Sequence, residues 1–549
     1  MPVLVRNVRI GLDEPEDGLT ARIAKRLRVP TSAVRRYAVV RRSLDARRKD
    51  FIHFSYQVEV DLNEPRRRQK LRVERLSDPN VTWVEPPADE EPRPGSHPLP
   101  QRPIIVGFGP GGMFAALRLA RLGYQPIVLE RGREVRERHR DILLRFYRHR
   151  DFDPESNLLF GEGGAGTYSD GKLYTRIHNP LCRYILETFY HHGAEPDVLV
   201  DARPHIGSDR LPTLCTRPRR TIASLGGEAR SRCRVDDVEV REGRLARLHI
   251  TGEGATAGSE WIDTGPTIFA VGHSARDTIR MLHRRGVPLV AKPFQIGVRI
   301  EHPQAMVDRW QYGAAAGHRR LGPAEYHLVA KRAAGPHGDL FSFCMCPGGT
   351  ILPTSEAPHQ IATNGASRAK RSTAFANSGL VITLDPARVL SSEGEQLALD
   401  SLSFLEGWER RAFEAGGGTY AVPAQRASDF LEGKRSDGTL ETSYPLGGRW
   451  TTIADVVPEA VVTALRNALP MLGERFPGFA GDEAVITAPE SRASAPVRIP
   501  RDPQTRQAEG VAGLYPVGEG AGYAGGIISA AVDGLRSADA VIRLYAPVR

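Results

Sequence analysis

The first 62 residues carry short, regular patterns of hydrophobic and polar positions. Residues 3–10 and 52–62 alternate in the manner of half-buried strands. Residues 19–27 instead place apolar side chains at helical spacing, and we expect Asp17 to cap that helix. Because strands and a helix follow one another over so short a stretch, the pattern predicts a small α+β domain over residues 1–85.

A proline-rich segment follows this domain. Seven prolines and several charged residues lie between residues 86 and 103. Proline fixes its own backbone and cannot donate to a strand or helix ladder, so such a segment favours an extended, semi-rigid chain. We therefore predict a linker over residues 86–103 that ends where the next strand begins.

The pattern then changes to that of a buried parallel sheet. An apolar run at 104–106 is followed by Gly107, Gly109 and Gly112, a helical pattern, and a second apolar run at 127–129. Gly107 suits a tight turn, Gly109 the close approach of a pyrophosphate, and Gly112 the packing of helix on strand. This order predicts a dinucleotide-binding βαβ unit. The alternative is a glycine-rich turn that holds no ligand.

The residues around this turn suit a bound nucleotide. The start of the helix, over Pro110, Gly111 and Met113, directs free backbone N–H groups at phosphates, although Pro110 itself has no N–H. Glu130 ends the second strand, 18 residues beyond the last glycine of the motif, and is expected to hydrogen-bond a ribose hydroxyl, with Arg131 beside it. An acid at this point favours the unphosphorylated ribose of FAD or NAD over that of NADP. The alternative for Glu130 is an ordinary surface carboxylate.

Four further segments decide between these nucleotides. They lie at residues 160–173, 234–238, 267–277 and 513–530. Together with the βαβ unit they resemble the two-part FAD-binding fold of the glutathione-reductase class, in which N- and C-terminal segments build one flavin site. More closely, nearly the whole chain resembles a group of uncharacterised FAD-dependent dehydrogenases. The resemblance implies one non-covalently bound FAD.

The resemblance also implies roles for individual residues. Gly518 precedes Glu519, which would bind the ribityl chain although aspartate is commoner there, and Val271 stands where threonine is usual. A C-terminal helix would point its positive N-terminus at the pyrimidine edge of the ring and stabilise negative charge on reduced flavin. The other implied cofactor residues are Val235 near the adenine, Gly272 beside the dinucleotide, Gly525, Gly526 and Ile527 at that helix start, and Gly164, Gly166, Thr167, Ser169 and Lys172 against the ring, with Asp170 as a polar neighbour. For residues 160–173 the alternative is a flexible surface loop.

The region between residues 293 and 485 lacks the dinucleotide pattern. Strand-like runs at 294–300 and 380–384 and helical patterns at 395–415 and 459–475 predict an α+β domain. In flavoproteins of the resembled fold, an insertion at this point covers the flavin and contacts the substrate. By analogy we expect the same role here.

The predicted fold class is therefore α/β. A Rossmann-like FAD-binding domain with a parallel sheet is expected over residues 104–292 and 486–549, split by an inserted α+β substrate domain and preceded by the small N-terminal α+β domain. We find no second complete unit in which a strand, this glycine motif and a helix follow one another. A separate NAD(P)H domain is therefore not expected, and a nicotinamide donor would bind transiently at the flavin face.

Cys344 and Cys346 are the first candidates for chemistry beyond the cofactor. Their C-x-C spacing differs from the C-x-x-C spacing of redox pairs, and we expect the two side chains to point to opposite faces of a strand. Three interpretations stay open: packing cysteines, a thiol near the flavin, or a metal or disulfide site. A metal would need two more ligands nearby, and the sequence identifies none, so we predict no metal site.

Charged residues supply weaker catalytic candidates. Lys172 lies in the glycine-rich loop, and Arg492 and Arg498 suit bidentate binding of a substrate carboxylate or phosphate. A structural ion pair is the alternative for these arginines. His273 is a candidate proton carrier near neutral pH, with a hydrogen-bonded structural histidine as the alternative. The catalytic residues therefore stay open.

The charge of the chain raises a second hypothesis. The formal net charge of the 549 residues is +10, and the first 97 residues hold 20 Lys and Arg against 15 Asp and Glu. A basic domain can attract nucleic acid, so an RNA-binding or RNA-modifying flavoprotein is the alternative function. A solvated arginine-rich surface is the plainer interpretation.

The remaining composition fits a cytoplasmic enzyme. The sequence has no run of 18 apolar residues, lacks a signal-peptide core, and scatters only five cysteines. The leading hypothesis is an FAD-dependent oxidoreductase, a dehydrogenase that transfers hydride or electrons between a small-molecule substrate, the flavin and an electron-transfer partner. A flavin-bound assembly protein without turnover is a third hypothesis.

Overall fold

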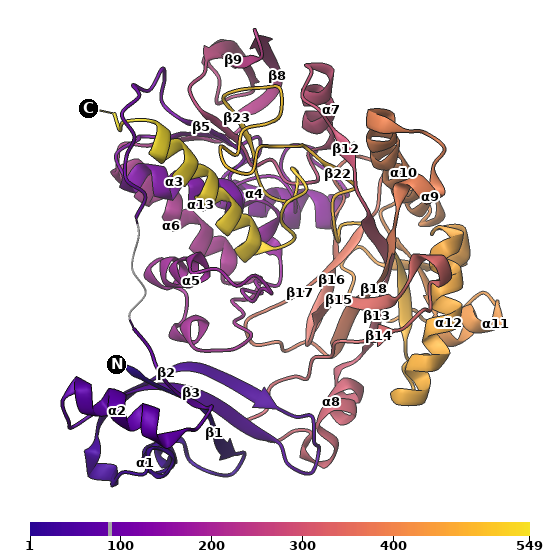
Figure 1. The fold of residues 1–549 in the computed structure, drawn as a ribbon. Coiled ribbons are helices and arrows are strands. Elements are labelled where there is room, and N and C mark those ends of the chain that lie inside the picture. The colour runs from indigo at the N-terminus through magenta and orange to yellow at the C-terminus, as the bar shows by residue number, and fades with distance from the viewer. Residues whose placement is uncertain (86–90, 549) are drawn as a thin grey trace.

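The N-terminal unit is a four-stranded antiparallel sheet with two helices (Figure 1). The structure, a computed structural model, describes residues 1–85 and 91–548. The strand order β2-β3-β1-β4 with one helix after β1 and another after β3 is the βαββαβ arrangement of ferredoxin-like folds. Its elements are β1 (Val3–Gly11), α1 (Leu19–Leu27), β2 (Val34–Asp45), β3 (His53–Leu62), α2 (Arg66–Leu76) and β4 (Val81–Trp83).

The small α+β unit is thus confirmed, with two corrections. Gly18, rather than Asp17, is the N-cap of α1, and Asp17 lies in a preceding 3-10 turn that spans Glu16–Gly18. The helix α2 was not predicted, because it is rich in arginine and buries only Gln69 and Val73, which leaves no apolar stripe to detect.

The predicted proline-rich linker falls partly outside the described residues, which omit 86–90. The described remainder lies along the C-terminal end of the chain. Gly95 N–H donates to Ile542 O at 2.8 Å, and Ala546 N–H donates to His97 O at 2.8 Å. This part of the segment is therefore held by the last helix of the protein.

A five-stranded parallel sheet forms the centre of the second unit (Figure 1). Its order is β23-β11-β5-β6-β7, so the C-terminal strand lies two places from the first strand of the glycine motif. All four neighbouring pairs are parallel. The strands are β5 (Ile104–Val106), β6 (Ile127–Leu129), β7 (Glu228–Arg230), β11 (Thr267–Phe269) and β23 (Leu514–Pro516).

Alternate residues of these strands face two separate cores. Ile105, Ile268 and Tyr515 pack with helices on one face, while Ile104 and Phe269 pack with an antiparallel meander on the other. The first face carries α3 (Pro110–Arg121), α6 (Leu211–Ser224) and α13 (Ile527–Leu544); the second carries α7 (Arg276–Arg284), β8 (Arg234–Arg241), β9 (Arg244–Thr251) and β10 (Ser259–Asp263). Two shorter helices, α4 (Val135–Arg140) and α5 (Leu181–His191), belong to the same unit. The Rossmann-like prediction is confirmed.

A seven-stranded mixed sheet forms the third unit, with the order β14-β15-β18-β13-β21-β19-β20. Its strands are β13 (Phe294–Pro303), β14 (Val329–Ala330), β15 (Leu340–Cys346), β18 (Phe375–Leu384), β19 (Val422–Arg426), β20 (Gly448–Trp450) and β21 (Val485–Glu490). The remaining elements are β16 (Gly349–Pro353) paired with β17 (Thr363–Ser367), and the helices α8 (Gln304–Tyr312), α9 (Pro386–Val389), α10 (Gly394–Ala415), α11 (Ala427–Glu432) and α12 (Glu459–Arg475). The short pair β12 (Val290–Ala291) and β22 (Val497–Arg498) joins the two larger units.

The two faces of this mixed sheet differ in chemistry. Ile296, Val298 and Ile300 of β13 pack into an apolar core with α8 and α12. The intervening residue Arg299 is fully buried on the opposite face and pairs with Glu490 of β21. The sheet therefore turns its polar face away from α12.

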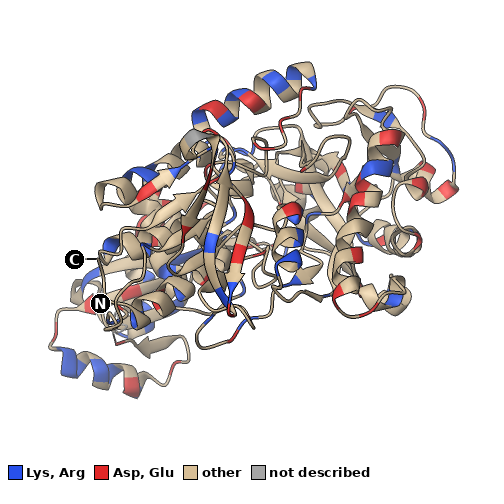
Figure 2. Cartoon of the chain, turned by 90° about the horizontal axis from the view of Figure 1, so that it is seen from above, with Lys and Arg blue, Asp and Glu red and all other residues tan. Residues whose placement is uncertain are grey.

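In the view of Figure 2, basic and acidic residues are interspersed over most of the described helices and strands, while α2 is mostly basic. No helix of the described residues is both long and apolar enough to cross a membrane.

Candidate cofactor and redox site

The glycine turn after β5 has the geometry that its spacing predicts. Gly107 has a φ of +96°, and a Cβ there would lie 2.6 Å from Ala270 O on the neighbouring strand end. A Cβ on Gly112 would clash with Gly107 O, so only glycine lets α3 start this close to the strand. Gly109 is the N-cap of α3, and among the described residues no side chain caps it. The first N–H groups of α3 therefore stay available to a ligand.

Glu130 is an organiser of this turn rather than a surface carboxylate. Its Oε2 accepts from Phe108 N–H, and its Oε1 accepts from the N–H groups of Gly132 and Gly161, each at 2.9 Å. A carboxylate offers about four lone-pair positions. Three are used within the protein, and about one remains for a ligand hydroxyl.

The loop of residues 160–173 is anchored, not flexible. Arg138 is fully buried and donates to Asn157 O at 2.7 Å and to Glu162 O at 2.9 Å. The Glu162 side chain accepts from Val135 N–H at 2.9 Å and from Arg219 at 2.7 Å. These bonds tie the loop to the start of α4 and to α6.

The anchored loop lies directly on the glycine turn. Gly163 N–H donates to Phe108 O at 3.0 Å, and a Cβ on Gly164 would lie 2.9 Å from Gly109 Cα. A Cβ on Gly166 would lie 3.4 Å from Pro110 Cγ and 3.8 Å from Ile527 Cγ1. Three segments far apart in sequence therefore meet at one place: the start of α3, the loop and the start of α13.

The side chains of this loop have mixed roles. Thr167 Oγ1 donates to Glu162 O, and Ser169 Oγ donates to Gly166 O, each at 2.8 Å, so both hydroxyls are engaged within the loop. Asp170 accepts from Ser367 N–H at 2.6 Å and pairs with Lys172 at 2.5 Å. The end of the loop is thus bound to the mixed sheet.

The C-terminal segment completes the convergence. A Cβ on Gly111 would lie 3.1 Å from Val517 Cγ1, and one on Gly534 would clash with Gly111 O, so α3 and α13 are in backbone contact. Gly518 N–H donates to Asp533 at 2.9 Å. Gly526 is the N-cap of α13, and in the described chain no side chain caps it.

Glu519 lies beside these elements in a low-dielectric setting. Its Oε1 accepts from Ala495 N–H at 2.7 Å. Burial raises the pKa of Glu519 to about 7, against the opposing effects of that hydrogen bond and of Lys292. A Cβ on the next glycine, Gly520, would clash with Gly272 O. The turns that follow β11 and β23 are therefore packed backbone to backbone.

A hollow lies between β8 and α7. It has a volume of about 250 Å³, and Val235 and Met281 give it apolar walls. Arg131, next to Glu130, pairs with Glu155 at 2.8 Å and with Asp277 at 3.0 Å, and Asp277 is also a wall of the hollow. The end of β6 therefore leads to this hollow.

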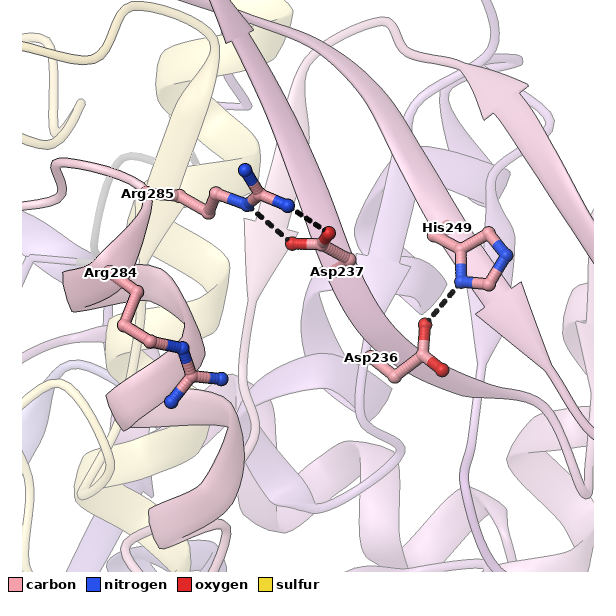
Figure 3. A pocket seen from close by; sticks show the side chains of 5 residues that line it. All are labelled: Asp236, Asp237, His249, Arg284 and Arg285. Carbon is pink, nitrogen blue, oxygen red and sulfur yellow. Dashed lines mark hydrogen bonds and ion pairs between the residues drawn. The ribbon is translucent and has the colours of Figure 1, made fainter.

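A second hollow, of about 580 Å³, is more open and more polar. Figure 3 shows that its lining comes from β8, β9 and the end of α7, where Asp237 pairs with Arg285 and Asp236 with His249 at 2.6 Å. None of the glycine segments contributes to it. Asp236, Asp237, His249 and Arg285 already have partners, and the lining is polar, so the hollow offers little to a flat apolar ring.

The two cysteines of β15 correct our prediction. Their sulfurs lie 3.9 Å apart, so the expectation of opposite faces was wrong. Alternate residues of a strand share a face, and an irregularity between Phe343 and Cys346 with a φ of +41° at Cys344 adjusts the pair further. Both sulfurs contact Lys172 Nζ, at 3.8 Å and 3.5 Å.

Arg492 lies in a closed ion-pair network. It pairs with Glu356 and, at 3.1 Å, with Glu409, which Arg276 also binds through two bonds of 3.0 Å. All four side chains are buried. The guanidinium of Arg492 therefore has carboxylate partners already, as the structural alternative expects.

Arg498 and His273 are placed differently. Arg498 donates weakly to Gly522 O at 3.4 Å and lies over the Tyr523 ring at 5.0 Å. Burial, with Arg492 and further cations nearby, lowers the pKa of His273 well below its ordinary value. A neutral His273 does not fit the role of a proton carrier near neutral pH.

Comparison with known proteins places these features in a family. Residues 293–493 match a family model described as "FAD-dependent protein, C-terminal domain-like", and residues 2–61 match a domain of unknown function. A protein of Clostridium beijerinckii, described as an uncharacterised protein, is 36% identical over 547 residues, which make up 99% of each chain. The chain belongs to this family of FAD-dependent proteins.

The solved structures that the chain resembles are more distant. E. coli quinol fumarate reductase FrdA is 12% identical with a TM-score of 0.35, over 80% of this chain and 70% of that chain. A variant of the flavin-dependent brominase Bmp2 is 12% identical with a TM-score of 0.36, over 80% and 79%. A geranylgeranyl bacteriochlorophyll reductase-like protein of Thermoplasma acidophilum is 12% identical with a TM-score of 0.33, over 81% and 78%.

Within this chain, most of the predicted cofactor residues come together. The three glycine segments meet, Glu519 lies beside the turn after β11, and Val235 lines the hollow beyond β6. Thr167 and Ser169 turn their hydroxyls into the loop. Arg492 lies apart from them in its own ion-pair network.

Several residues that shape the site were missed. Arg138, Glu162 and Asp533 hold the loop and the turn at Gly518, and Lys292 faces Glu519. Arginines are frequent in this chain, so nothing in the sequence separates Arg138 from exposed ones. Only its complete burial does.

Proposed function

We propose that this protein is an FAD-dependent oxidoreductase that binds FAD non-covalently between the glycine turn, the loop of residues 160–173 and the start of α13. The observation that carries the proposal is the meeting of Pro110, Gly166 and Ile527. At this point two helix N-termini without side-chain caps face a stretch of the loop in which Gly163, Gly164 and Gly166 have no Cβ. Such a place suits both a pyrophosphate and a flat ring whose reduced form is anionic.

The nucleotide half of FAD fits the residues near β6. The N–H groups that follow Gly109 would bind the pyrophosphate, and the remaining lone-pair position of Glu130 would accept a ribose hydroxyl. The hollow of about 250 Å³ beside Val235 would receive the adenine. Gly107, Gly111, Gly112 and Met113 would shape this path, and Arg131 would border it.

The flavin half fits the C-terminal segment. Glu519 has a pKa of about 7, so near neutral pH it can either donate to or accept from a ribityl hydroxyl. The uncapped N-terminus of α13, at Gly525 and Gly526, would stabilise negative charge at the pyrimidine edge. Gly272, Gly518, Gly164 and Gly166 would leave room for the cofactor backbone and ring.

Bound FAD would supply a two-electron acceptor for hydride from a small-molecule substrate. The chain would bind and orient the reactants and exclude water. The polar face of the mixed sheet contacts the far end of the cofactor loop through Asp170 and Lys172, which supports a substrate site on that side. A nicotinamide donor would bind there transiently, and electrons would leave to a separate partner.

The first test is the absorption spectrum of the purified protein. We expect the yellow flavin bands. Denaturation should release about one FAD per chain, because the described residues form one such FAD-binding site. Colourless protein that binds no added FAD would reject the proposal. FMN in place of FAD would also contradict the proposal, because FMN has no adenine to occupy the hollow beside Val235.

The second test separates an enzyme from a flavin-bound assembly protein. Anaerobically photoreduced protein should be reoxidised by an organic acceptor in a stopped-flow trace. Failure of every acceptor except oxygen would favour the assembly role. The RNA-binding alternative gains no support from the comparisons, and we do not propose it.

A further inference from the structure

Two thiols and one ammonium group lie together where the mixed sheet contacts the cofactor loop. Cys344 Sγ and Cys346 Sγ are 3.9 Å apart, and Lys172 Nζ is within 3.8 Å of both. Cys344 is half-buried, while Cys346 is fully buried. The pair therefore combines a half-buried and a fully buried cysteine.

The surroundings make the two thiols chemically unequal. The pKa of Cys344 is lowered to about 6, because its sulfur interacts with the Cys346 thiol and lies near the cations Lys172 and Arg299. Burial and the neighbouring Cys344 raise the pKa of Cys346 well above its ordinary value. At neutral pH this gives one thiolate and one thiol, which are the nucleophile and the proton donor that disulfide chemistry needs.

Other cysteines of the chain show what inert thiols look like. Cys215 and Cys233 are buried, and burial raises the pKa of each to about 11. Neither has a lysine within hydrogen-bond reach among the described residues. Among the cysteines of the described chain, contact with a lysine ammonium is thus particular to the C-x-C pair.

Hydrogen bonds from the buried Arg299 hold the C-terminal part of β15 in this conformation. Arg299 donates to Cys344 O at 3.2 Å, to Asn377 at 2.8 Å and to Glu490 at 2.8 Å. Cys346 Sγ also contacts Cys344 O at 3.2 Å. These contacts hold both side chains on the face that meets Lys172.

Lys172 connects the pair to the proposed flavin seat. It lies six residues beyond Gly166, whose position abuts the starts of α3 and α13. Asp170 ties the same loop to Ser367 of the mixed sheet at 2.6 Å. One short, anchored segment therefore touches both the thiols and the seat.

We propose that Cys344 and Cys346 form a dithiol–disulfide centre that exchanges two electrons with bound FAD, an inference that rests on the proposed function. In the oxidising direction the Cys344 thiolate and Cys346 thiol form an S–S bond. Two electrons and the Cys346 proton pass to FAD, which becomes the anionic reduced flavin, so charge and protons balance. The sulfurs close from 3.9 Å to about 2.05 Å by side-chain rotation.

The reverse reaction breaks the S–S bond and returns FAD to its oxidised form. The substrate class that follows is a dithiol or disulfide, or a partner protein that carries one, because thiol–disulfide exchange at half-buried Cys344 would connect this centre to it. Lys172 acts as a positioning residue that stabilises the Cys344 thiolate.

The test is an anaerobic reductive titration of the holoprotein, with FAD content measured first. We expect about four electrons per bound FAD in the wild type, and about two in Cys344→Ser and in Cys346→Ser, because each couple takes two. Cys182→Ser, a half-buried cysteine elsewhere, should keep about four. Uptake of about two electrons by FAD-loaded wild type would overturn the inference but leave the proposed function standing. Absence of FAD would reject both.

Alkylation followed by mass spectrometry gives a readout independent of the flavin. In oxidised, denatured protein the peptide that holds both cysteines should resist alkylation until a reductant is added. Full alkylation without reductant would contradict the centre.

The role of Lys172 has its own test. In reduced protein, Lys172→Met should move the pH midpoint of Cys344 alkylation upward by about one unit or more, and Lys172→Arg should restore it. An unchanged midpoint in Lys172→Met would exclude the positioning role, since a merely structural lysine would not shift it.

Discussion

The proposed FAD site, hereafter the seat, and the polar face of the mixed sheet are built from opposite kinds of groups. The seat is made of backbone: Gly109 and Gly526 start helices without side-chain caps. The polar face is made of buried charges, such as Arg299 with Glu490 and Arg276 with Glu409. A backbone site fails when a Cβ is added, whereas a buried charge site fails when one partner is removed. The two regions should therefore respond to different kinds of substitution.

The largest effect is expected in the ion-pair network. Glu409→Gln leaves Arg276 and Arg492 with Glu356 alone, and should lower the free energy of unfolding by about 3–5 kcal/mol. Urea denaturation measures it. The control is Glu406→Gln, one turn earlier on α10, whose ion pairs involve partly exposed arginines and which should cost about 1 kcal/mol or less. Equal losses in the two variants would contradict the contrast.

Arg138→Met should come next, because Arg138 is a buried charge that holds the loop of the proposed FAD site. The substitution leaves the buried Asn157 O without its donor and Glu162 O with Thr167 Oγ1 as its remaining donor, at a cost of about 2–4 kcal/mol. The detached loop should also bind FAD more weakly. Arg136→Met, on an exposed position of the same helix, is the control. Unfolding and FAD titrations together check the prediction, which a stable variant with normal affinity would refute.

A pH effect of the proposed seat should be smaller. The pKa of Glu519 is raised to about 7, so the folded apoprotein favours the protonated carboxyl. Its contribution is fully present below the unfolded pKa of about 4.3 and is lost as pH rises through about 7. Glu519→Gln apoprotein should match the wild type at pH 5 more nearly than at pH 8, where it should be more stable by about 1–3 kcal/mol. A stability difference that does not change between these pH values would contradict the raised pKa.

The smallest effect is expected at the polar hollow of Figure 3. Arg285 is solvent-exposed and pairs with Asp237. Arg285→Gln should change neither stability nor FAD content measurably, because exposed ion pairs are screened. A loss of FAD in this variant would show that FAD binds at the polar hollow rather than at the site that we propose.

The sequence predicted the parts of the protein that depend on neighbouring residues. The glycine turn, the strands at 104–106 and 127–129 and the helix Glu459–Arg475 follow from local spacing, and all are confirmed. The Asp17 cap failed because a 3-10 turn intervenes before α1. The short strands β14 and β20 have too few residues to produce a pattern.

The site was less predictable because its contacts join distant residues. Lys172 meets Cys344 across 172 positions, and Arg276 meets Glu409 across 133. No spacing rule covers such pairs. Cys344 and Cys346 are only two residues apart, so the sequence could have predicted that their side chains lie on one face of the strand. Our expectation of opposite faces was wrong.

The most direct test of the central claim is the FAD affinity of Gly109→Val. Gly109 has an ordinary φ of −72°, and a Cβ there meets no described atom nearer than 3.9 Å, so the variant should fold. Its side chain would occupy the pyrophosphate position. Gly407→Val, on α10, is the control, because a Cβ there meets nothing described within 4 Å. We predict an affinity about 10–100-fold weaker for Gly109→Val and unchanged for the control. Equal, wild-type affinity in both folded variants would contradict the account.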